Sequence, residues 1–266
     1  MRIAPPDTID QEVLAEYLRI SGSGIQVEVL DQCGSTNALL LERAKAGAPH
    51  ASALVCELQT AGKGRRGNAW ISAAGEGLTF SLLWQFGSGV SALSGLSLAV
   101  ALASARALES QGGAQIKLKW PNDLLFAERK LGGILVESFQ VAGRTVVVIG
   151  IGLNVRVAAA LRARVGHPIA DLREAGVRAT RTALLAAQLA QLAQLLPRFE
   201  KQGFAPLREE WHARHAWQGK KVRLSSGGQT QAEGEILGVA EDGALLMRAG
   251  GAIKPYYSGE LSLRLA

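Results

Sequence analysis

The feature that most constrains this chain is a loop rich in glycine and positive charge, residues 59–70, between two apolar runs at residues 51–58 and 78–84. Short apolar runs bounded by glycine and polar residues predict buried strands. Glycines let a backbone approach a ligand closely and leave its N–H groups open. The sequence therefore predicts a strand, a long loop that holds a phosphate or carboxylate, and a second strand.

Three glycines of this loop, Gly62, Gly64 and Gly67, match the spacing of the dinucleotide-binding fingerprint. That fingerprint requires a helix that begins inside the glycines and an acidic residue roughly 20 residues later. Neither follows here, because residues 71–77 lead into a strand. A dinucleotide-binding fold is therefore excluded, and the loop is either an anion site or a solvated basic loop.

The composition suits a globular protein with one large domain, or with a larger and a smaller one. Lysine and arginine outnumber aspartate and glutamate by 29 to 23, and the net charge of +6 fits an anionic ligand or an acidic protein partner without demanding nucleic acid. Cys33 and Cys56 have no metal-ligand spacing, so both are expected to be reduced and to lie in or near the core.

The first ten residues lack the apolar segment of a signal peptide. Residues 78–105 carry no charge, but glycine, glutamine and serine interrupt them, and their pattern changes midway from strand to helix. A buried strand followed by a buried helix is therefore expected instead of a membrane span. The expected location is the cytoplasm.

Periodicity and turn residues divide the first 217 residues into a mixture of helices and strands, which is typical of an α+β fold. Asp10 and the Gly34–Asn37 stretch supply helix N-caps, and Pro197 is expected to bend or end its helix. The expected helices are residues 10–19, 38–46, 91–110, 181–202 and 204–215. The expected strands are residues 25–30, 51–58, 78–84, 116–120, 130–140 and 145–155, the last two forming a hairpin that turns near Ala142 and Gly143.

The character of the chain changes at Gly219, where short apolar strands separated by glycine pairs begin. An Asp-Gly pair between apolar runs, here Asp242-Gly243, is a strong hairpin signal. We therefore expect two domains, residues 1–217 and a small β-barrel at residues 218–266. The strands expected in the barrel are residues 221–224, 232–239, 244–248 and 261–265.

Polar clusters interrupt the apolar elements where chemistry could be placed. Ser35, Thr36 and Asn37 either cap a helix or donate to a small polar ligand. Lys119 and Asp123 flank a Trp-Pro-Asn turn, which is either an ordinary turn or a site where both residues face a charged ligand, with or without a metal ion.

Glycines within strands form the remaining signals. Gly132 and Gly133 indicate a bulge or a close ligand approach, and Lys130 beside them is either a ligand contact or a solvated strand-end lysine. Asn154 ends a second glycine-containing strand, where its amide suits an adenine edge. His212 and His215, three residues apart on an expected helix, are assigned to the surface in preference to a metal pair.

The order of these motifs closely resembles the biotin–protein ligases, over roughly residues 25–265. The resemblance implies a central mixed sheet related to class II aminoacyl-tRNA synthetases and an SH3-like C-terminal barrel. It also implies two half-reactions, in which biotin and Mg²⁺-ATP give biotinyl-5′-adenylate and a specific lysine of a biotin carboxyl carrier protein then takes the biotin. The motifs that carry it are Ser35–Asn37, residues 59–67, 119–124, 130–137 and 150–154.

The resemblance assigns roles to residues of this chain. The catalytic candidates are Arg65 and Lys130, because a carboxylate that attacks a phosphate needs positive charge, and Asp123, which would steer a metal ion or the incoming lysine. The implied biotin site is Ser35, Thr36, Asn37, Gln59, Gly62, Lys63, Gly64, Arg65, Lys130, Gly132 and Gly133. The implied ATP and adenylate site is Arg65, Arg66, Gly67, Trp70, Lys119, Trp120, Asn122, Lys130 and Asn154. No resident metal site is expected.

Two positions depart from the family pattern, since Lys63 and Asn68 stand where members often have arginine. Lys63 keeps the charge but not the planar fork, and Asn68 loses a cation. Few residues precede Ser35, so a catalytic-only ligase without a helix-turn-helix domain and without DNA binding is expected. The carrier of acetyl-CoA carboxylase is the implied partner, and both monomer and homodimer stay open.

Two alternatives differ in class. A lipoate-type ligase would need a pocket for a dithiolane, whereas Gln59 with Ser35 and Thr36 favours a polar ureido ring. A basic nucleic-acid-binding protein would need aromatic residues interleaved with cations on its strands. Tyr256 and Tyr257 are adjacent and would point to opposite faces of a strand, which disfavours that second alternative.

Overall fold

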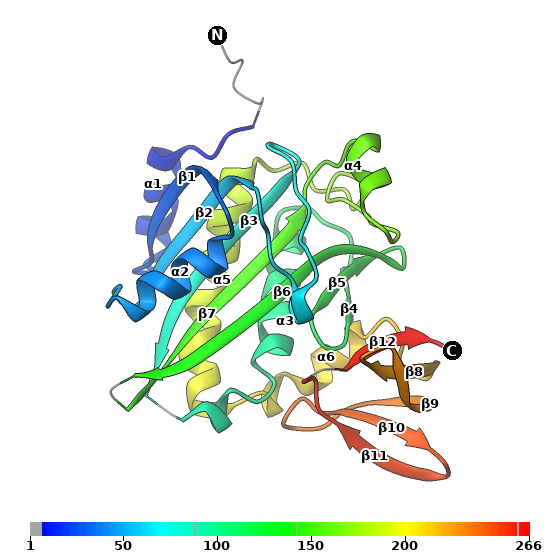
Figure 1. The fold of residues 1–266 in the computed structure, drawn as a ribbon. Helices are drawn as coiled ribbons and strands as arrows, with labels where there is room; N and C mark the ends of the chain where they lie inside the picture. Colours follow the sequence, from blue (N-terminus) through cyan, green and yellow to red (C-terminus); the bar gives the residue numbers. More distant parts are fainter. Residues whose placement is uncertain (1–6, 88, 142, 260) are drawn as a thin grey trace.

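The centre of the protein is a seven-stranded sheet, seen here in a computed structural model that describes residues 7–87, 89–141, 143–259 and 261–266. The strand order is β1-β2-β3-β7-β6-β5-β4 (Figure 1). β1 and β2 run parallel and all other neighbours run antiparallel, so the predicted mixed sheet is confirmed. The strands are β1 (Gln26–Cys33), β2 (Ser52–Gln59), β3 (Gly77–Phe86), β4 (Lys117–Lys119), β5 (Asp123–Phe126), β6 (Arg129–Val141) and β7 (Arg144–Asn154).

Helices cover both faces of this sheet, and in Figure 1 α2 lies on the near side, with α3 and α5 on the far side. The predicted α+β class is therefore confirmed. The α-helices are α1 (Gln11–Ser21), α2 (Thr36–Lys45), α3 (Leu96–Ser110), α4 (Ala159–Arg164), α5 (Arg181–Gln202) and α6 (Arg208–Arg214). Short 3₁₀ turns are η1 (Arg65–Gly67), η2 (Val90–Leu93) and η3 (Ala205–Leu207).

The two faces of the sheet differ because side chains alternate between faces along each strand. The far face carries residues such as Phe80 and Ile149 into the main core with α1, α3 and α5. The near face carries Leu83 and Val148 beneath α2. The same near face continues along the strands into Ser81, opposite Gly150 in the neighbouring strand. This half of the near face is polar and rich in glycine, so no apolar side chains fill it and a ligand can lie there.

Local signals explain where the helices begin. The side chain of Asp10 accepts a hydrogen bond from the Val13 N–H, and that of Ser35 accepts one from the Ala38 N–H. Both residues are therefore N-caps, as the sequence predicted. Pro197 neither ends nor interrupts α5, which continues to Gln202.

The helix expected at residues 91–110 is divided. Its first turn is η2, and α3 begins only at Leu96 because Gly95 adopts a left-handed conformation with φ of 79°. A Cβ atom at Gly95 would lie 2.6 Å from the Cβ of Phe204, so this position also admits only glycine sterically. The stretch Val90–Ser110 is long and apolar enough to cross a membrane, but most of α3 is buried in the core of the protein.

The C-terminal segment forms a second sheet of antiparallel strands in the order β11-β10-β9-β8-β12. Its hydrogen-bonded order is open within the described residues, with β11 and β12 at the edges. The sequence did not predict β11, which contains Pro255, a residue tolerated at an edge. The strands are β8 (Lys221–Ser226), β9 (Gln229–Val239), β10 (Leu245–Ala249), β11 (Ala252–Tyr256) and β12 (Ser262–Leu265).

The second sheet is joined to the first domain through buried contacts. The indole N–H of Trp120 donates to the carbonyl of Gly243, which lies between β9 and β10. Trp120 is 1% exposed. The turn around Trp120 therefore holds the two sheets together. In Figure 1 the second sheet lies below β4 and β5, beside α6.

Candidate active site

A cavity of about 480 Å³ opens on the near face of the central sheet. Its floor consists of residues from β3, β6 and β7, and its walls come from the α2 N-terminus and the glycine-rich loop. Residues 166–169 and strand β12 of the second sheet complete the wall. Segments from both sheets thus meet at one cavity, and most of the predicted site residues line it.

One end of the cavity is lined by hydroxyl and amide groups. The Thr36 N–H donates to Oε1 of Gln59 at 2.7 Å, and the Thr36 hydroxyl is 3.2 Å from the same oxygen. Ser81 Oγ lies 2.8 Å from Thr36 Oγ1 and 2.9 Å from Asn37 Oδ1. Ser35, Thr36, Asn37 and Gln59 are all buried, so this end is a preorganised polar pocket.

The glycine-rich loop folds back on itself over the cavity. The Trp70 N–H donates to the Gly62 carbonyl, and the Gly64 N–H donates to the Asn68 carbonyl. A Cβ atom at Gly62 would lie 2.4 Å from the carbonyl oxygen of Trp70, so this close approach requires glycine. At the tip, Arg66 and Gly67 have φ of 56° and 73°, in the left-handed region. The loop is a tight turn, as its glycines indicated.

Arg65 at the tip of the loop connects the two sheets. Its Nη2 donates to the carbonyls of Ser258 and Gly259 at 2.7 and 2.9 Å, and its Nη1 donates to Oδ1 of Asn122 at 3.2 Å. Asn122 in turn donates to the carbonyl of Ile134. Arg65 and Asn122 therefore hold the loop against the turn before β5 and the second sheet.

Glycines in β6 and β7 make room for the ring of Trp70. A Cβ atom at Gly152 would lie 2.5 Å from Cε2 of Trp70, and one at Gly133 would lie 3.6 Å from Cζ3. A Cβ atom at Gly132 would instead meet the carbonyl of Gly152 in the next strand, at 2.8 Å. The paired glycines that the sequence identified therefore have two functions, one in the strand pairing and one beneath Trp70.

A half-buried carboxylate lies between two lysines at the other end of the cavity. Lys130 Nζ is 2.7 Å from Oδ1 of Asp123, and Lys119 Nζ is 3.5 Å from Oδ2. Burial raises the pKa of the Asp123 carboxyl, but the two ammonium groups outweigh it and leave the pKa lowered. Burial lowers the pKa of Lys119, although Asp123 opposes that change. Asp123 is therefore an ionised partner that orients both lysines.

Asn154 lies at the end of β7, next to the cavity. Its Nδ2 donates to the carbonyls of Lys130 and Ala170, at 3.1 and 3.0 Å, so both amide protons are used within the protein. Only Oδ1 of Asn154 remains to accept from a ligand. Trp120 also lines the cavity, but its ring is buried between the two sheets instead of forming an open plane.

Positive charge dominates the cavity. Six of the described lining residues are lysine or arginine and two are acidic, which gives a formal excess of four positive charges (6 − 2 = 4). Such a concentration suits a ligand with several negative charges, such as a nucleotide. The basic residues are Lys63, Arg65, Arg66, Lys119, Lys130 and Arg264, and the acidic ones are Asp123 and Glu128.

Several lining residues were not predicted from the sequence. Arg264 comes from β12 and His167 from the segment after α4, and only the tertiary fold brings them to Lys130. Burial lowers the pKa of His167, and the charge of Lys130 lowers it further. Thr79 and Ser81 had a usable signal, because they are polar and alternate with apolar residues along a predicted strand.

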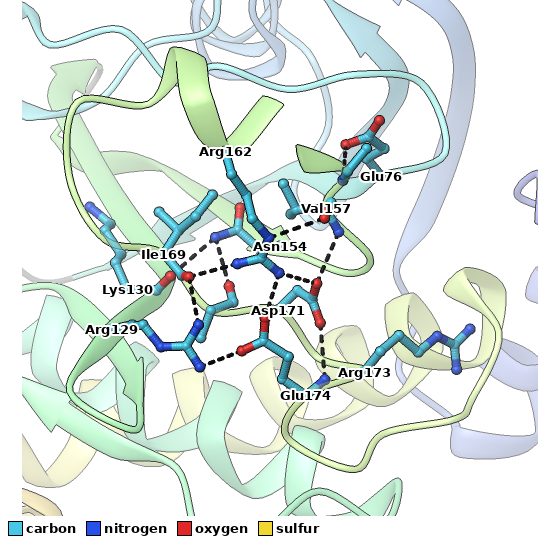
Figure 2. A network of polar contacts seen from close by, with 12 residues as sticks. Glu76, Arg129, Lys130, Asn154, Val157, Arg162, Ile169, Asp171, Arg173 and Glu174 are labelled. Atoms are coloured by element: carbon cyan, nitrogen blue, oxygen red, sulfur yellow. Dashed lines mark hydrogen bonds and ion pairs between the residues drawn. The ribbon is translucent and has the colours of Figure 1, made fainter. Parts of the chain in front are cut away.

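A network of polar contacts fixes the segment after β7 against the start of β6 (Figure 2). Arg162 in α4 donates to the carbonyl of Ile169 at 2.8 Å and pairs with Asp171 and Glu174 at 2.6 and 2.5 Å. Glu174 also pairs with Arg129, the residue before Lys130. The backbone of residues 168–170 then bonds to both the N–H and the carbonyl of Lys130. The network thus fixes the backbone of a cavity lysine.

The prediction that His212 and His215 lie on the surface is wrong for His215, and His212 is half-buried. His215 is 5% exposed and packs against the ring of Trp211, and His212 Nε2 accepts from the Val239 N–H. Burial lowers the pKa of His215 to about 4. His212 therefore joins α6 to the second sheet, and His215 packs at the end of α6 beside β4. No group of three or more His, Cys, Asp or Glu side chains placed to hold a metal occurs within the described ranges.

The cavity joins a polar pocket to a cluster of cations. Such a cavity is typical of the class of proteins that bind an acid and a nucleotide together. Comparison with known proteins agrees with this class. Residues 29–154 match the biotin/lipoate A/B protein ligase family, and residues 219–264 match the biotin protein ligase C-terminal domain.

Similarity to individual proteins identifies the family more specifically. The bifunctional ligase/repressor BirA of Escherichia coli (strain K12) is 37% identical over 247 residues, which are 91% of this chain and 75% of the relative. The biotin–[acetyl-CoA-carboxylase] ligase of Mycobacterium tuberculosis is 34% identical over 98% of this chain and 97% of its own length. The biotin protein ligase of Aquifex aeolicus, solved with biotin and ATP, superposes with a TM-score of 0.74 and 29% identity, covering 91% of this chain and 99% of that one. The chain belongs to the biotin protein ligase family.

Proposed function

We propose that the protein forms biotinyl-5′-adenylate from biotin and ATP and transfers the biotin to a lysine of a carrier protein. The observation that carries this proposal is the single cavity with a hydroxyl-lined pocket at one end and six cations around it. The carrier proposed is the biotin carboxyl carrier protein of acetyl-CoA carboxylase, in line with the name of the mycobacterial relative. The cytoplasm is the proposed location.

The first half-reaction joins two anions, so its transition state needs fixed positive charge. We assign the biotin head to the pocket around Ser35, Thr36 and Gln59, with the carboxylate directed towards Lys130. Arg65, Arg66 and Lys119 are assigned to the nucleotide. The carboxylate oxygen attacks the α-phosphorus of ATP, and pyrophosphate leaves with the Mg²⁺ that entered on the nucleotide.

The second half-reaction requires a neutral lysine of the carrier at the adenylate carbonyl. Attack forms the amide and releases AMP. Asp123 is proposed to act through Lys119 and Lys130, because both of its oxygens face these ammonium groups in the free protein. Arg65 is proposed to retain the adenylate by keeping the glycine-rich loop closed until the carrier arrives.

The proposed domains correspond to the two sheets. We propose a catalytic domain at residues 1–217 and a C-terminal domain at residues 218–266. The second domain supplies Arg264 to the cavity wall and the carbonyls that Arg65 contacts. Each domain therefore contributes to one site, and neither would bind ATP alone as tightly as the pair.

The test is ATP–pyrophosphate exchange by the purified protein with biotin, with lipoate and with no acid. Exchange with biotin alone is expected. Exchange with lipoate alone would assign the protein to the lipoate branch of the matched family, and the absence of exchange with either acid would refute the adenylation step. Transfer is then tested by following the mass of a purified biotin carboxyl carrier domain, which should rise by one biotinyl group.

A further inference from the structure

One carboxylate close to the polar pocket lies outside the cavity and has no part in the proposed chemistry. Glu137 on β6 accepts a hydrogen bond from Nδ2 of Asn37 at 2.5 Å. Asn37 is 3% exposed, lines the cavity, and follows Ser35 and Thr36 at the start of α2. Among the described residues, Glu137 therefore reaches the pocket through its hydrogen bond to Asn37.

The amide of Asn37 is seated above a glycine. A Cβ atom at Gly150 would lie 2.4 Å from Oδ1 of Asn37, so a larger residue would displace the amide. Gly150 pairs with Ser81 of β3 on one side and with Leu135 of β6 on the other. The amide therefore spans β7, with Glu137 on one side and Ser81 on the other.

The carboxylate decides the direction of the hydrogen bonds across this span. An ionised carboxylate only accepts, so the NH₂ group of Asn37 must face Glu137 and its carbonyl oxygen must face Ser81. A carbonyl oxygen also only accepts, so the single hydroxyl proton of Ser81 goes to Asn37, at 2.9 Å.

The direction of these hydrogen bonds also determines how Thr36, which lines the cavity, can bond. Because the Ser81 proton goes to Asn37, Ser81 Oγ can only accept from its other neighbour. That neighbour is Thr36 Oγ1, which lies 2.8 Å away. The Thr36 hydroxyl donates either to Ser81 or to Oε1 of Gln59, and both partners are in the wall. In each case Thr36 has no proton to direct into the cavity, so its oxygen faces a ligand as an acceptor.

We propose that Glu137 is a positioning residue that fixes the pocket wall as an acceptor and thereby selects an acid whose head carries N–H groups. The inference rests on the proposed function, in which that head is the ureido ring of biotin. If the amide of Asn37 were reversed, Ser81 would accept from Asn37 and donate to Thr36. One lone pair of Thr36 Oγ1 would then accept the Ser81 proton, while Gln59 would remain the wall acceptor for the Thr36 proton, so Thr36 would offer a ligand N–H one acceptor position fewer.

The test is Glu137→Gln, because glutamine has the same shape but can face Asn37 with either its carbonyl or its NH₂. The KM for biotin in ATP–pyrophosphate exchange is expected to rise about tenfold, the effect of one mispaired hydrogen bond. The KM for ATP should change less than twofold, since the cations around the nucleotide are untouched. This split separates a positioning role from general damage to the fold.

Glu28→Gln is the matched control. Glu28 on β1 pairs with Arg43 of α2, so this substitution also removes a carboxylate that ties α2 to the sheet, but far from Asn37. The biotin KM of Glu28→Gln is expected to stay at the wild-type value. An unchanged biotin KM in Glu137→Gln, equal increases in both KM values, or the same increase in Glu28→Gln would each overturn the proposal.

A double-mutant cycle tests the route through Ser81. Ser81→Ala interrupts the chain of hydrogen bonds, so adding Glu137→Gln to it should change the biotin KM less than twofold further. Additive effects would overturn the proposal. If Glu137→Gln does not fold, Glu137→Asp is used in its place. Aspartate still accepts from Asn37 but is one methylene shorter, so this variant should keep part of the biotin affinity. If the wild-type protein shows no biotin-dependent exchange, the proposed function fails first, which distinguishes the two failures.

Discussion

His215 provides a stability prediction whose magnitude follows from the structure. The ring is buried against Trp211 of α6, its Nδ1 lies 3.3 Å from Oε1 of Gln218, and burial lowers its pKa from 6.5 to about 4. Because the unfolded chain binds the proton more tightly than the folded one, acid favours unfolding. The contribution of His215 to stability is complete above pH 6.5 and is lost as the pH falls from 6.5 towards 4.

The magnitude follows from the two pKa values. Lowering the pKa from 6.5 to about 4 corresponds to about 3 kcal/mol when the loss is complete. Between pH 7 and pH 5 the same linkage relation gives a loss of about 2 kcal/mol in the free energy of unfolding. This loss is specific to His215, so it must be measured against a variant that cannot titrate there.

The variant is His215→Phe, which keeps an aromatic ring against Trp211. Guanidinium unfolding of both proteins is measured at pH 7 and pH 5. The wild type should lose about 2 kcal/mol more than the variant over this range. Equal losses in the two proteins, or an NMR titration of His215 with a midpoint above pH 6, would refute the burial argument.

Four further predictions concern the site. Lys130→Gln should lower kcat/KM for biotin-dependent pyrophosphate exchange at least 100-fold, because a fixed charge at the reacting carboxylate is lost. Arg65→Gly should still form the adenylate but release it, so that lysines of an unrelated protein become biotinylated; strict specificity for the carrier would contradict this. Gly152→Ala should cost about 1–3 kcal/mol in the free energy of unfolding, because the methyl group overlaps the Trp70 ring; an unchanged denaturation midpoint would contradict it. Arg162→Met should raise the KM for ATP by loosening the segment that holds Lys130, with the Arg248→Met variant, which breaks an exposed ion pair on the second sheet, as control.

Much of the fold could be predicted because its signals are local. Asp10 and Ser35 mark helix starts through their own side chains, and the glycine pairs of the second sheet mark its turns. Errors occurred where distant residues decide local structure. Gly95 divides the predicted helix because Phe204 packs against it, and His215 is buried where the chain pairs with Leu118 of the distant strand β4.

The candidate site divides in the same way. The glycine-rich loop, Lys130 and the Ser35–Asn37 start of α2 were recognisable because each motif is contiguous and rare. Arg264 and His167 gave no such signal, because a single arginine or histidine gains meaning only when folding places it beside other charges. The contact between Arg65 and the second sheet likewise depends on how the two sheets are joined.

The sequence by itself determined the chemical groups of this protein and the strands and loops that carry them, since these depend on residue type, periodicity and spacing. Only the tertiary structure decided which groups act together. It placed Asp123 between two lysines, set Trp70 above Gly152, and put Glu137 behind the wall of the pocket. The physical reason is that charge pairing and hydrogen-bond direction depend on distances of a few ångströms, and the packing of segments far apart in the chain sets those distances.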